Sequence, residues 1–279
     1  MGQQEDTVEL RSKSLPREKT MKERLRKKLW YLRESYGIVG VKGGTEVEDM
    51  SFEELAVLKE LSDGIVPMIV KIGGPEARND IRQCLKIGVE GLLAPMVESE
   101  YGLSNFVDTV RELAGPMFES LYLAINIETI TGYYNINSII NQSGFQALQQ
   151  VTVGRSDLAG SMEYTVNHQE VTKLTQDIVS RIHKAEKLSS VGGKIDAISA
   201  QTVRDNISPD RINTRHLSID LSKSKNLTFS VCESLSFEIE LYRLFMELDS
   251  DKAESYEKRI EDTKIRLAKR DIAFIPTFT

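Results

Sequence analysis

The sequence predicts an α/β protein, a (β/α)8 TIM barrel with additional helices at its C-terminal end. Strand-like and helix-like segments alternate along most of the 279 residues. Strand starts lie roughly 25 to 40 residues apart, as expected for βα units of a parallel sheet. An open doubly wound sheet is the alternative, but no glycine-rich dinucleotide turn follows any early strand.

The clearest strand is the stretch LYLAINIET at 121–129, where apolar residues occupy every second position from Leu121 to Ile127. Six more strands are expected where short apolar or β-branched runs are bounded by turn residues, at 37–41, 66–72, 89–94, 149–153, 188–191 and 211–217. The eighth strand has the weakest signal. We expect it at 7–10 or, failing that, at 227–231.

Helices are expected between these strands and after the last one. The helix at 51–61 begins with a capping box, in which Ser51 is the N-cap and Glu54 its partner. The helix at 76–87 ends at Gly88, which suits the C′ position. The remaining helices are expected at 16–34, 100–113, 135–140, 168–186, 198–206, 229–248 and 255–270.

Length and composition favour one barrel domain over residues 1–279, with a flexible segment at 1–16 and a C-terminal helical extension at 227–279. The net charge of −6 argues against nucleic acid as a partner. No apolar run reaches the roughly 18 residues of a membrane span, and the chain starts without an apolar signal region. The two cysteines are too few for a disulfide framework, so we expect a cytoplasmic protein.

The helix expected at 229–248 carries apolar residues over most of its circumference. Such a helix must be covered on more than one side. The barrel covers one side, and a neighbouring chain is expected to cover the other, which predicts a homo-oligomer. The alternative is a monomer in which the last helix folds back over the exposed side.

Ionisable residues gather at the expected carboxyl ends of the strands: Lys42, Glu46, Lys71, Glu98, Glu128, Asp157 and Arg215. Glu128 and Asp157 follow neighbouring strands, so they can share one hard cation such as Mg²⁺, which is held by one or two carboxylates with waters and substrate oxygens. The structural alternative is that Glu128 opens a helix and Asp157 caps one.

Four segments in order, VKIGGPEARND, GVEGLLAPMVES, INIETITGYYNI and VGRSDLAGSM, resemble the HpcH/HpaI aldolase and citrate lyase β-subunit superfamily. The likeness covers roughly residues 36–217. It implies a βα barrel assembled into trimers or hexamers through C-terminal helices. It also implies Mg²⁺ or Mn²⁺ as cofactor, with Glu128 and Asp157 as its ligands. The motif Gly154-Arg155-Ser156 would bind substrate, with the backbone amides of Ser156 and Asp157 holding the carboxylate of an oxo acid.

The chain departs from the family pattern at two positions. Lys71 stands where relatives usually have an arginine. It is expected to polarise the keto oxygen of the substrate or, as a second reading, to form a Schiff base. Relatives carry a histidine after the second strand, and none is present here. The general base would then be Glu46, Glu48 or a metal-bound water. Arg215 is a candidate clamp for a distal carboxylate or phosphate.

We therefore expect a metal-dependent carbon–carbon lyase, a class II aldolase that joins or releases pyruvate, or a related 2-oxo acid, and an aldehyde through a metal-stabilised enolate. A CoA-thioester lyase of the citrate or malyl-CoA type is the alternative among enzymes. A barrel that binds an oxo acid without catalysis is the alternative from another class.

Overall fold

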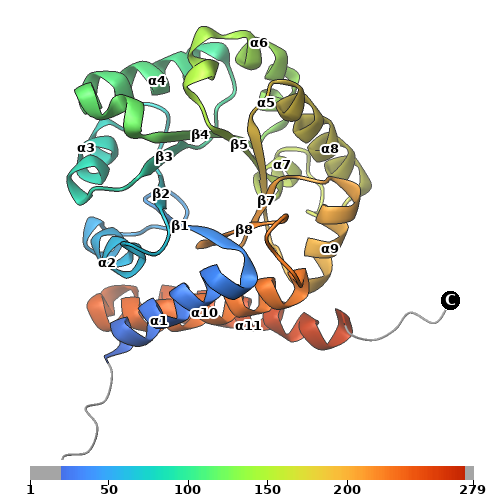
Figure 1. Ribbon diagram of the computed structural model, residues 1–279. Coiled ribbons are helices and arrows are strands. Elements are labelled where there is room, and N and C mark those ends of the chain that lie inside the picture. Colours follow the sequence, from blue (N-terminus) through green and yellow to red (C-terminus); the bar gives the residue numbers. More distant parts are fainter. Residues whose placement is uncertain (1–19, 274–279) are drawn as a thin grey trace, which may run out of the picture.

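The computed structural model describes residues 20–273, and within them eight strands close into a barrel (Figure 1). The strands follow one another around the barrel in sequence order: β1 (Ile38–Gly44), β2 (Met68–Lys71), β3 (Gly91–Ala94), β4 (Tyr122–Ile127), β5 (Gln150–Gly154), β6 (Leu188–Gly192), β7 (Arg211–Asn213) and β8 (Leu217–Asp220). From β1 to β7 all neighbours are parallel. The predicted eight-stranded barrel is confirmed.

The last strand differs from the prediction. β8 runs antiparallel to both β7 and β1, and a short hairpin turn joins it to β7. The segment 211–217, expected as one strand, is divided by this turn, in which Thr214 N donates to Leu217 O at 3.0 Å. The eighth strand expected at 227–231 is wrong, because these residues begin a helix capped by the Asn226 side chain, which accepts from Phe229 N at 3.1 Å. The segment 7–10 lies outside the described residues.

Helices surround the barrel, and most lie where the sequence places them: α1 (Met21–Tyr36), α2 (Phe52–Ser62), α3 (Arg78–Ile87), α4 (Glu100–Ala114), α5 (Ile130–Tyr134), α6 (Ile136–Asn141), α7 (Arg155–Ser161), α8 (Gln169–Lys184), α9 (Ala197–Asn206), α10 (Leu227–Leu248) and α11 (Ala253–Ala273). The capping box before α2 is confirmed, since Ser51 Oγ accepts from Glu54 N at 3.1 Å and Glu54 Oε2 accepts from Ser51 N at 2.7 Å. Gly88 ends α3 with a left-handed φ of +79°, as expected.

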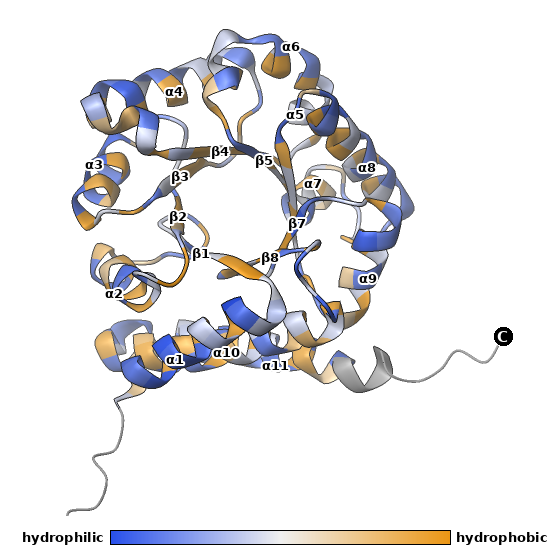
Figure 2. Ribbon diagram, in the orientation of Figure 1, coloured by the Kyte–Doolittle hydropathy of each residue, from blue (hydrophilic) through white to orange (hydrophobic). Residues whose placement is uncertain are grey.

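Alternating strand residues face the helices or the barrel interior. Residues such as Val70, Leu92 and Val153 belong to the large core between strands and helices. In Figure 2 these helices carry both hydrophobic and hydrophilic residues, as amphipathic helices around a barrel do. The interior holds a separate small apolar cluster of Ile69, Leu93 and Ala124. These three side chains therefore fill the barrel interior at their own level. A site can form in the space beyond them.

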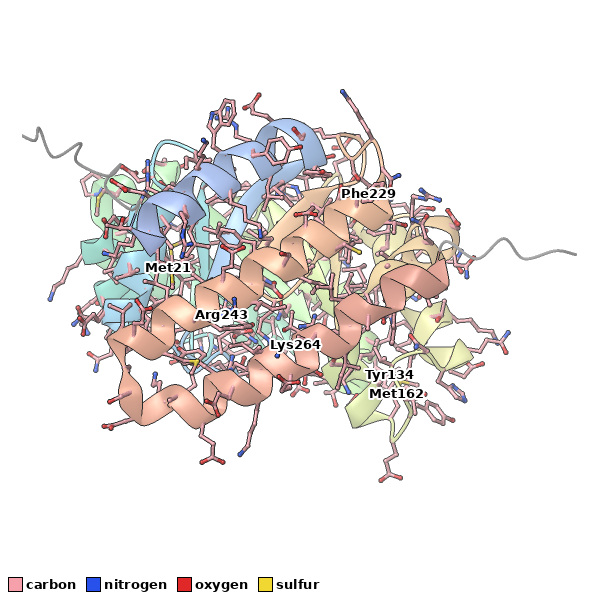
Figure 3. All side chains as sticks on the ribbon, turned by 90° about the horizontal axis from the view of Figure 1, so that it is seen from below. Met21, Tyr134, Met162, Phe229, Arg243 and Lys264 are labelled. Atoms are coloured by element: carbon pink, nitrogen blue, oxygen red, sulfur yellow. The ribbon has the colours of Figure 1, made fainter. Side chains whose placement is uncertain are left out.

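Three helices form a layer across the β1–β8 side of the barrel (Figure 1). Figure 3 shows α10, marked by Phe229 and Arg243, lying between α1, marked by Met21, and α11, marked by Lys264. Most apolar residues of α10 are buried by this arrangement within one chain. The second side of α10 is thus covered by α11 folding back, and this helix by itself does not require a partner chain.

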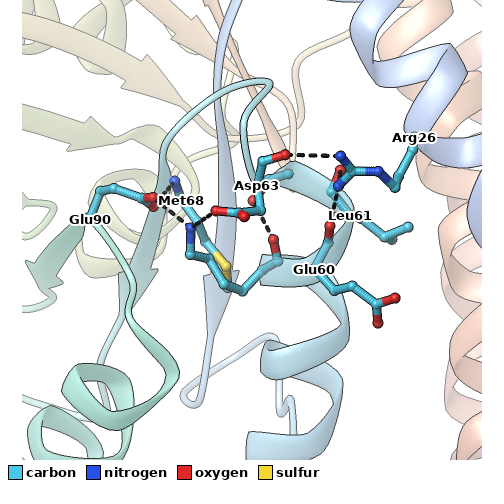
Figure 4. Close-up of polar contacts among 8 residues, drawn as sticks. Arg26, Glu60, Leu61, Asp63, Met68 and Glu90 are labelled. Carbon is cyan, nitrogen blue, oxygen red and sulfur yellow. Dashed lines mark hydrogen bonds and ion pairs between the residues drawn. The ribbon is translucent and has the colours of Figure 1, made fainter.

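Polar contacts tie α1 to the amino-terminal end of the barrel (Figure 4). Arg26 donates to the carbonyl groups of Leu61 at 3.2 Å and Asp63 at 3.0 Å, at the C-terminal end of α2. Lys59 binds Glu90 Oε1 at 2.6 Å, and Glu90 Oε2 in turn accepts from Met68 N at 2.9 Å. The Arg26 contacts thus satisfy carbonyl groups that the end of α2 leaves without helical partners.

Two smaller expectations concern membranes and cysteines. Within residues 20–273, no helix is long and apolar enough to cross a membrane. Cys84 and Cys232 are both buried. Burial raises the pKa of the Cys84 thiol to about 12, so this group is not a nucleophile near neutral pH.

Candidate functional site

A pocket of about 330 Å³ opens at the carboxyl ends of the parallel strands. Its lining comes from β1, β2, β4, β5, β6 and β7 near their carboxyl ends, from the β7–β8 turn, and from α7 and α11. The polar and charged side chains that line it are Lys42, Glu48, Lys71, Asn126, Glu128, Thr152, Ser156, Asp157, Lys194, Asn213, Thr214, Arg215, Asp262 and Arg266. Most residues singled out in the sequence thus face one pocket.

Glu128, which follows β4, is the most enclosed carboxylate of this pocket, with 3% of its surface exposed. Its Oε1 accepts from Met96 N at 2.9 Å, and its Oε2 accepts from Asn126 Nδ2 at 2.9 Å. Met96 has a φ of +51°, an unusual conformation for a residue with a side chain. Burial raises the pKa of Glu128, and the charge of Asp157 acts in the same direction, whereas the Met96 hydrogen bond and Lys71 oppose it.

Asp157 lies in the first turn of α7, directly after β5, and its side chain is exposed at the pocket. Gly154 ends β5 beside Glu128, and a Cβ at this position would overlap the Glu128 side chain. Gly193, with a φ of +101°, lies so close to Ser156 that a Cβ there would come within 2.7 Å of its backbone nitrogen. Small residues therefore keep the space between the two carboxylates and the loop after β6 open.

Comparison with known proteins identifies the family. The family model described as HpcH/HpaI aldolase/citrate lyase matches residues 62–204, which include β2 to β6 and the residues Lys71, Glu128 and Asp157. This chain belongs to the HpcH/HpaI aldolase/citrate lyase family.

One curated relative is a hydroxypyruvate/pyruvate aldolase from Pseudomonas aeruginosa, 26% identical over 150 residues. These residues make up 45% of this chain and 54% of the relative, so the match spans about half the length of that aldolase.

Solved structures share the fold at low sequence identity. An HpcH/HpaI aldolase from Desulfitobacterium hafniense has a TM-score of 0.55 and 16% identity, over 67% of this chain and 79% of that one. A family protein from Burkholderia cenocepacia has a TM-score of 0.54 and 14% identity, over 68% of this chain and 90% of that one.

Lys71 ends β2 and forms ion pairs with two carboxylates that follow β1. Its Nζ lies 2.6 Å from Glu46 Oε2 and 3.3 Å from Glu48 Oε2. Burial lowers the pKa of Lys71, but Glu48 and Glu46 outweigh it and raise the pKa overall. Lys71 is thus a fixed positive charge in the pocket.

Glu46 and Glu48 do not lie on a strand, since β1 ends at Gly44 and both follow in a turn. They nevertheless converge on Lys71. Burial raises the pKa of Glu48, but Lys71, Lys42 and Arg215 together lower it to about 2. Glu48 lines the pocket as a permanent anion, and Glu46 contacts Lys71 from outside the lining.

Arg215 lies in the turn between β7 and β8, and its Nη1 is 3.9 Å from Glu48 Oε1. It remains partly exposed at the pocket, as a clamp for a distal anionic group requires. The next residue, His216, is buried beneath the rim, where its backbone N donates to Glu238 Oε1 at 2.6 Å. Burial lowers the pKa of His216, and the ring is not part of the lining.

Arg155 has a different position from its neighbours in the motif. Gly154 and Ser156 line the pocket, but the Arg155 side chain is buried and its Nη2 donates to Val166 O and Asn167 Oδ1, both at 3.1 Å. This side chain holds the loop after α7. The family resemblance implied a substrate contact for Arg155 as part of its motif, and a motif does not show which way a side chain points.

Several lining residues had no assigned role in the sequence. Asn126 and Thr152 are interior strand residues two positions before Glu128 and Gly154, and the alternation of strand residues places them in the same interior. Lys194 follows Gly192-Gly193, where the glycine pair was the available signal. Asp262 and Arg266 come from α11, which reaches the pocket only through the packing of the C-terminal helices.

The residues present fit a divalent cation. Each oxygen of Glu128 accepts one hydrogen bond, which leaves further lone pairs, and burial disfavours an unpartnered anion there. Gly154 keeps the adjacent space free of a side chain. Within residues 20–273, His, Cys, Asp and Glu side chains form no group of three or more that would hold a metal. The candidate donor set is the two carboxylates Glu128 and Asp157, and Mg²⁺ sites with one or two carboxylates are completed by water and substrate.

Proposed function

We propose that this chain is a divalent-metal-dependent carbon–carbon lyase of the aldolase type, acting on pyruvate or a related 2-oxo acid and an aldehyde. One observation carries the proposal: Glu128, Asp157 and Lys71 line the same pocket at the carboxyl ends of the barrel strands. The family and the relative named hydroxypyruvate/pyruvate aldolase support it.

Glu128 and Asp157 would hold Mg²⁺ or Mn²⁺ beside the substrate. When bound, the cation supplies positive charge that stabilises the enolate of the oxo acid. The first turn of α7 has backbone N–H groups without helical partners, at Ser156 and Asp157, which suits the substrate carboxylate. Gly154 leaves room for the Glu128 carboxylate beside this position, because a Cβ there would overlap it.

Lys71 would stabilise the developing negative charge on the keto oxygen. Its pKa is raised by the Glu46 and Glu48 carboxylates, so the amine is charged at neutral pH. A charged amine is an electrostatic stabiliser and not a nucleophile, which disfavours the Schiff-base reading for this residue. Arg215, at the rim, would contact an anionic group on the second substrate.

A non-catalytic barrel that binds an oxo acid is the second candidate. It is favoured by the contacts of Glu46 and Glu48, since both carboxylates are paired with Lys71 and neither is available as a general base. A CoA-thioester lyase has no comparable observation in its support.

We further propose that residues 1–279 form one barrel domain with its C-terminal helices, that the protein works in the cytoplasm, and that it assembles as a homo-oligomer, a trimer or hexamer. The buried cysteines suit a reducing compartment. The family resemblance supports the assembly, whereas the coverage of α10 by α11 leaves other surfaces to form its contacts.

Deuterium exchange into pyruvate, followed by mass spectrometry, tests the proposed activity. Exchange is expected with Mn²⁺ and no aldehyde, and it should disappear when the metal is chelated. Glu128→Gln and Asp157→Asn should each abolish exchange and also the increase in thermal stability that Mn²⁺ gives the wild type. Binding of oxalate without any exchange by the wild type would instead support the non-catalytic barrel.

A further inference from the structure

The side chain of Lys42 points into the barrel. Lys42 lies on β1 opposite Ile69, and the next residue, Gly43, faces α2, because a Cβ at Gly43 would overlap Leu55. Successive side chains of a strand point to opposite faces, so Lys42 faces the interior. It is one of the residues that line the pocket.

The amine of Lys42 has no hydrogen-bond or ion-pair partner among residues 20–273, although the Lys42 backbone pairs with His216. Lys71, in the same pocket, is paired with two carboxylates. The interior therefore holds the Lys71 amine, which is paired with carboxylates, and the Lys42 amine, which has no such partner. Lys42 is half-buried and lines the pocket, so a bound ligand can reach its amine.

The carboxylates proposed from the sequence are poor proton acceptors. Glu46 lies 2.6 Å from the Lys71 amine, and the pKa of Glu48 is lowered to about 2. His216 is buried outside the pocket, and the other histidines lie at the start of α8 and near its end. Glu46 and Glu48 are thus engaged by positive charges, and no histidine is among the residues that line the pocket.

We propose that Lys42 is the general base of this site, removing a proton from carbon 3 of the bound 2-oxo acid. The C–H bond breaks, its electron pair forms the enolate, and the proton adds to Nζ to give an ammonium ion. The reverse transfer returns a proton to the enolate carbon. This inference rests on the proposed function, because it requires that the pocket binds an oxo acid.

The charges around Lys42 favour this role. Burial lowers its pKa to about 8, and Lys71 on β2 and Arg215 in the β7–β8 turn act in the same direction. Glu48 after β1 and Glu128 after β4 oppose them. A base must be uncharged to accept a proton, so the rate should rise as the pH increases through about 8 and reach a plateau above it.

Variants of Lys42 test the proposal by deuterium exchange into pyruvate in the presence of Mg²⁺. Lys42→Met should lower the exchange rate by roughly a hundredfold or more. Its affinities for Mn²⁺ and for oxalate should stay near those of the wild type, which shows that the pocket is intact. The matched control is Lys184→Met, which removes an exposed lysine outside the pocket and should exchange as fast as the wild type.

A chemically restored amine separates proton transfer from a structural role. Lys42→Cys, alkylated with 2-bromoethylamine, carries a lysine analogue whose amine is more acidic than that of lysine. Exchange should return, and its rise with pH should move to lower pH. The wild type treated in the same way is the control for reaction at the buried cysteines.

The outcomes separate the inference from the proposed function. A wild type that exchanges while Lys42→Met exchanges equally fast overturns the role of Lys42 alone. Restored exchange with an unshifted pH profile also overturns it, as does a Lys42–pyruvate adduct trapped by borohydride, which would make Lys42 a nucleophile. A wild type without exchange overturns both the proposed function and this inference.

Discussion

At the scale of single residues, two lysines in one pocket have opposite electrostatic environments. Carboxylates surround the Lys71 amine and raise its pKa, whereas burial lowers the pKa of Lys42. The same residue type can therefore stabilise an anion at one position and accept a proton at the other. Both residues lie on strands of the barrel, and only the three-dimensional contacts distinguish them.

Replacing Lys71 tests its electrostatic role. Lys71→Met should reduce turnover by several orders of magnitude, because the developing charge on the keto oxygen loses its partner. Mn²⁺ binding should remain near normal, since Glu128 and Asp157 are unchanged. Exchange rates and Mn²⁺ titrations of this variant check both statements, and wild-type turnover in Lys71→Met would remove the role.

Gly154 tests the space beside the proposed cation site. Gly154→Ala should weaken Mn²⁺ binding markedly, because the added Cβ would overlap the Glu128 side chain and displace its carboxylate. Gly74→Ala is the matched control, since a Cβ there has nothing within 4 Å. Calorimetric titration of both variants decides the point, and equal affinities would contradict the importance of this space.

Much of the site is readable from the sequence, but side-chain direction is not. Glu128, Asp157 and Lys71 were predicted from polar residues at strand ends and from the family resemblance, and they face one pocket. Arg155 has the same kind of position, yet its side chain is held by Val166 and Asn167. Direction at a strand end depends on the following turn, which the local sequence does not determine.

At the scale of helices and strands, the end of the barrel is the part that the apolar pattern does not predict correctly. Strands β1 to β7 were predicted, because each is a short apolar run bounded by turn residues. The turn between β7 and β8 contains Thr214, Arg215 and His216, without the glycine or proline that usually marks a hairpin. The sequence therefore predicts one strand where the structure has a hairpin. The chain reverses in this hairpin, which places Arg215 at the rim of the pocket.

The docking of α11 on α10 can be tested with a tyrosine. Tyr256 is buried, with its ring 5.7 Å from that of Phe245 and 5.8 Å from that of Tyr242. Tyr256→Ala should lower the free energy of unfolding by roughly 3 kcal/mol, because a large buried ring is lost.

The control is Tyr101→Ala, where 73% of the side chain is exposed and the change should stay within about 0.5 kcal/mol. Urea unfolding of both variants measures the difference. Equal stabilities would show that α11 is not docked as described.

At the scale of the whole molecule, apolar side chains are buried between the barrel and the helices around it, including the layer of α1, α10 and α11. The apolar character of α10 predicts that other surfaces cover this helix. In the structure, α1 and α11 of the same chain cover it. A hydrophobic pattern shows that a helix must be covered, but it does not show by which chain.

Light scattering tests the proposed assembly. A trimer or hexamer should give a mass of about three or six times the chain mass of 31.5 kDa at micromolar concentration. A single species at 31.5 kDa would contradict the oligomer and would agree with α11 as the complete cover of α10.

The most direct test of the central claim is a crystal structure of the protein with Mn²⁺ and pyruvate, in which anomalous scattering locates the metal. We predict one Mn²⁺ ion held by the carboxylates of Glu128 and Asp157, with the Lys71 amine at the keto oxygen of pyruvate and the Lys42 amine nearest its methyl carbon. A Mn²⁺ ion bound elsewhere, or pyruvate seated in the pocket with no metal between these two carboxylates, would contradict the account.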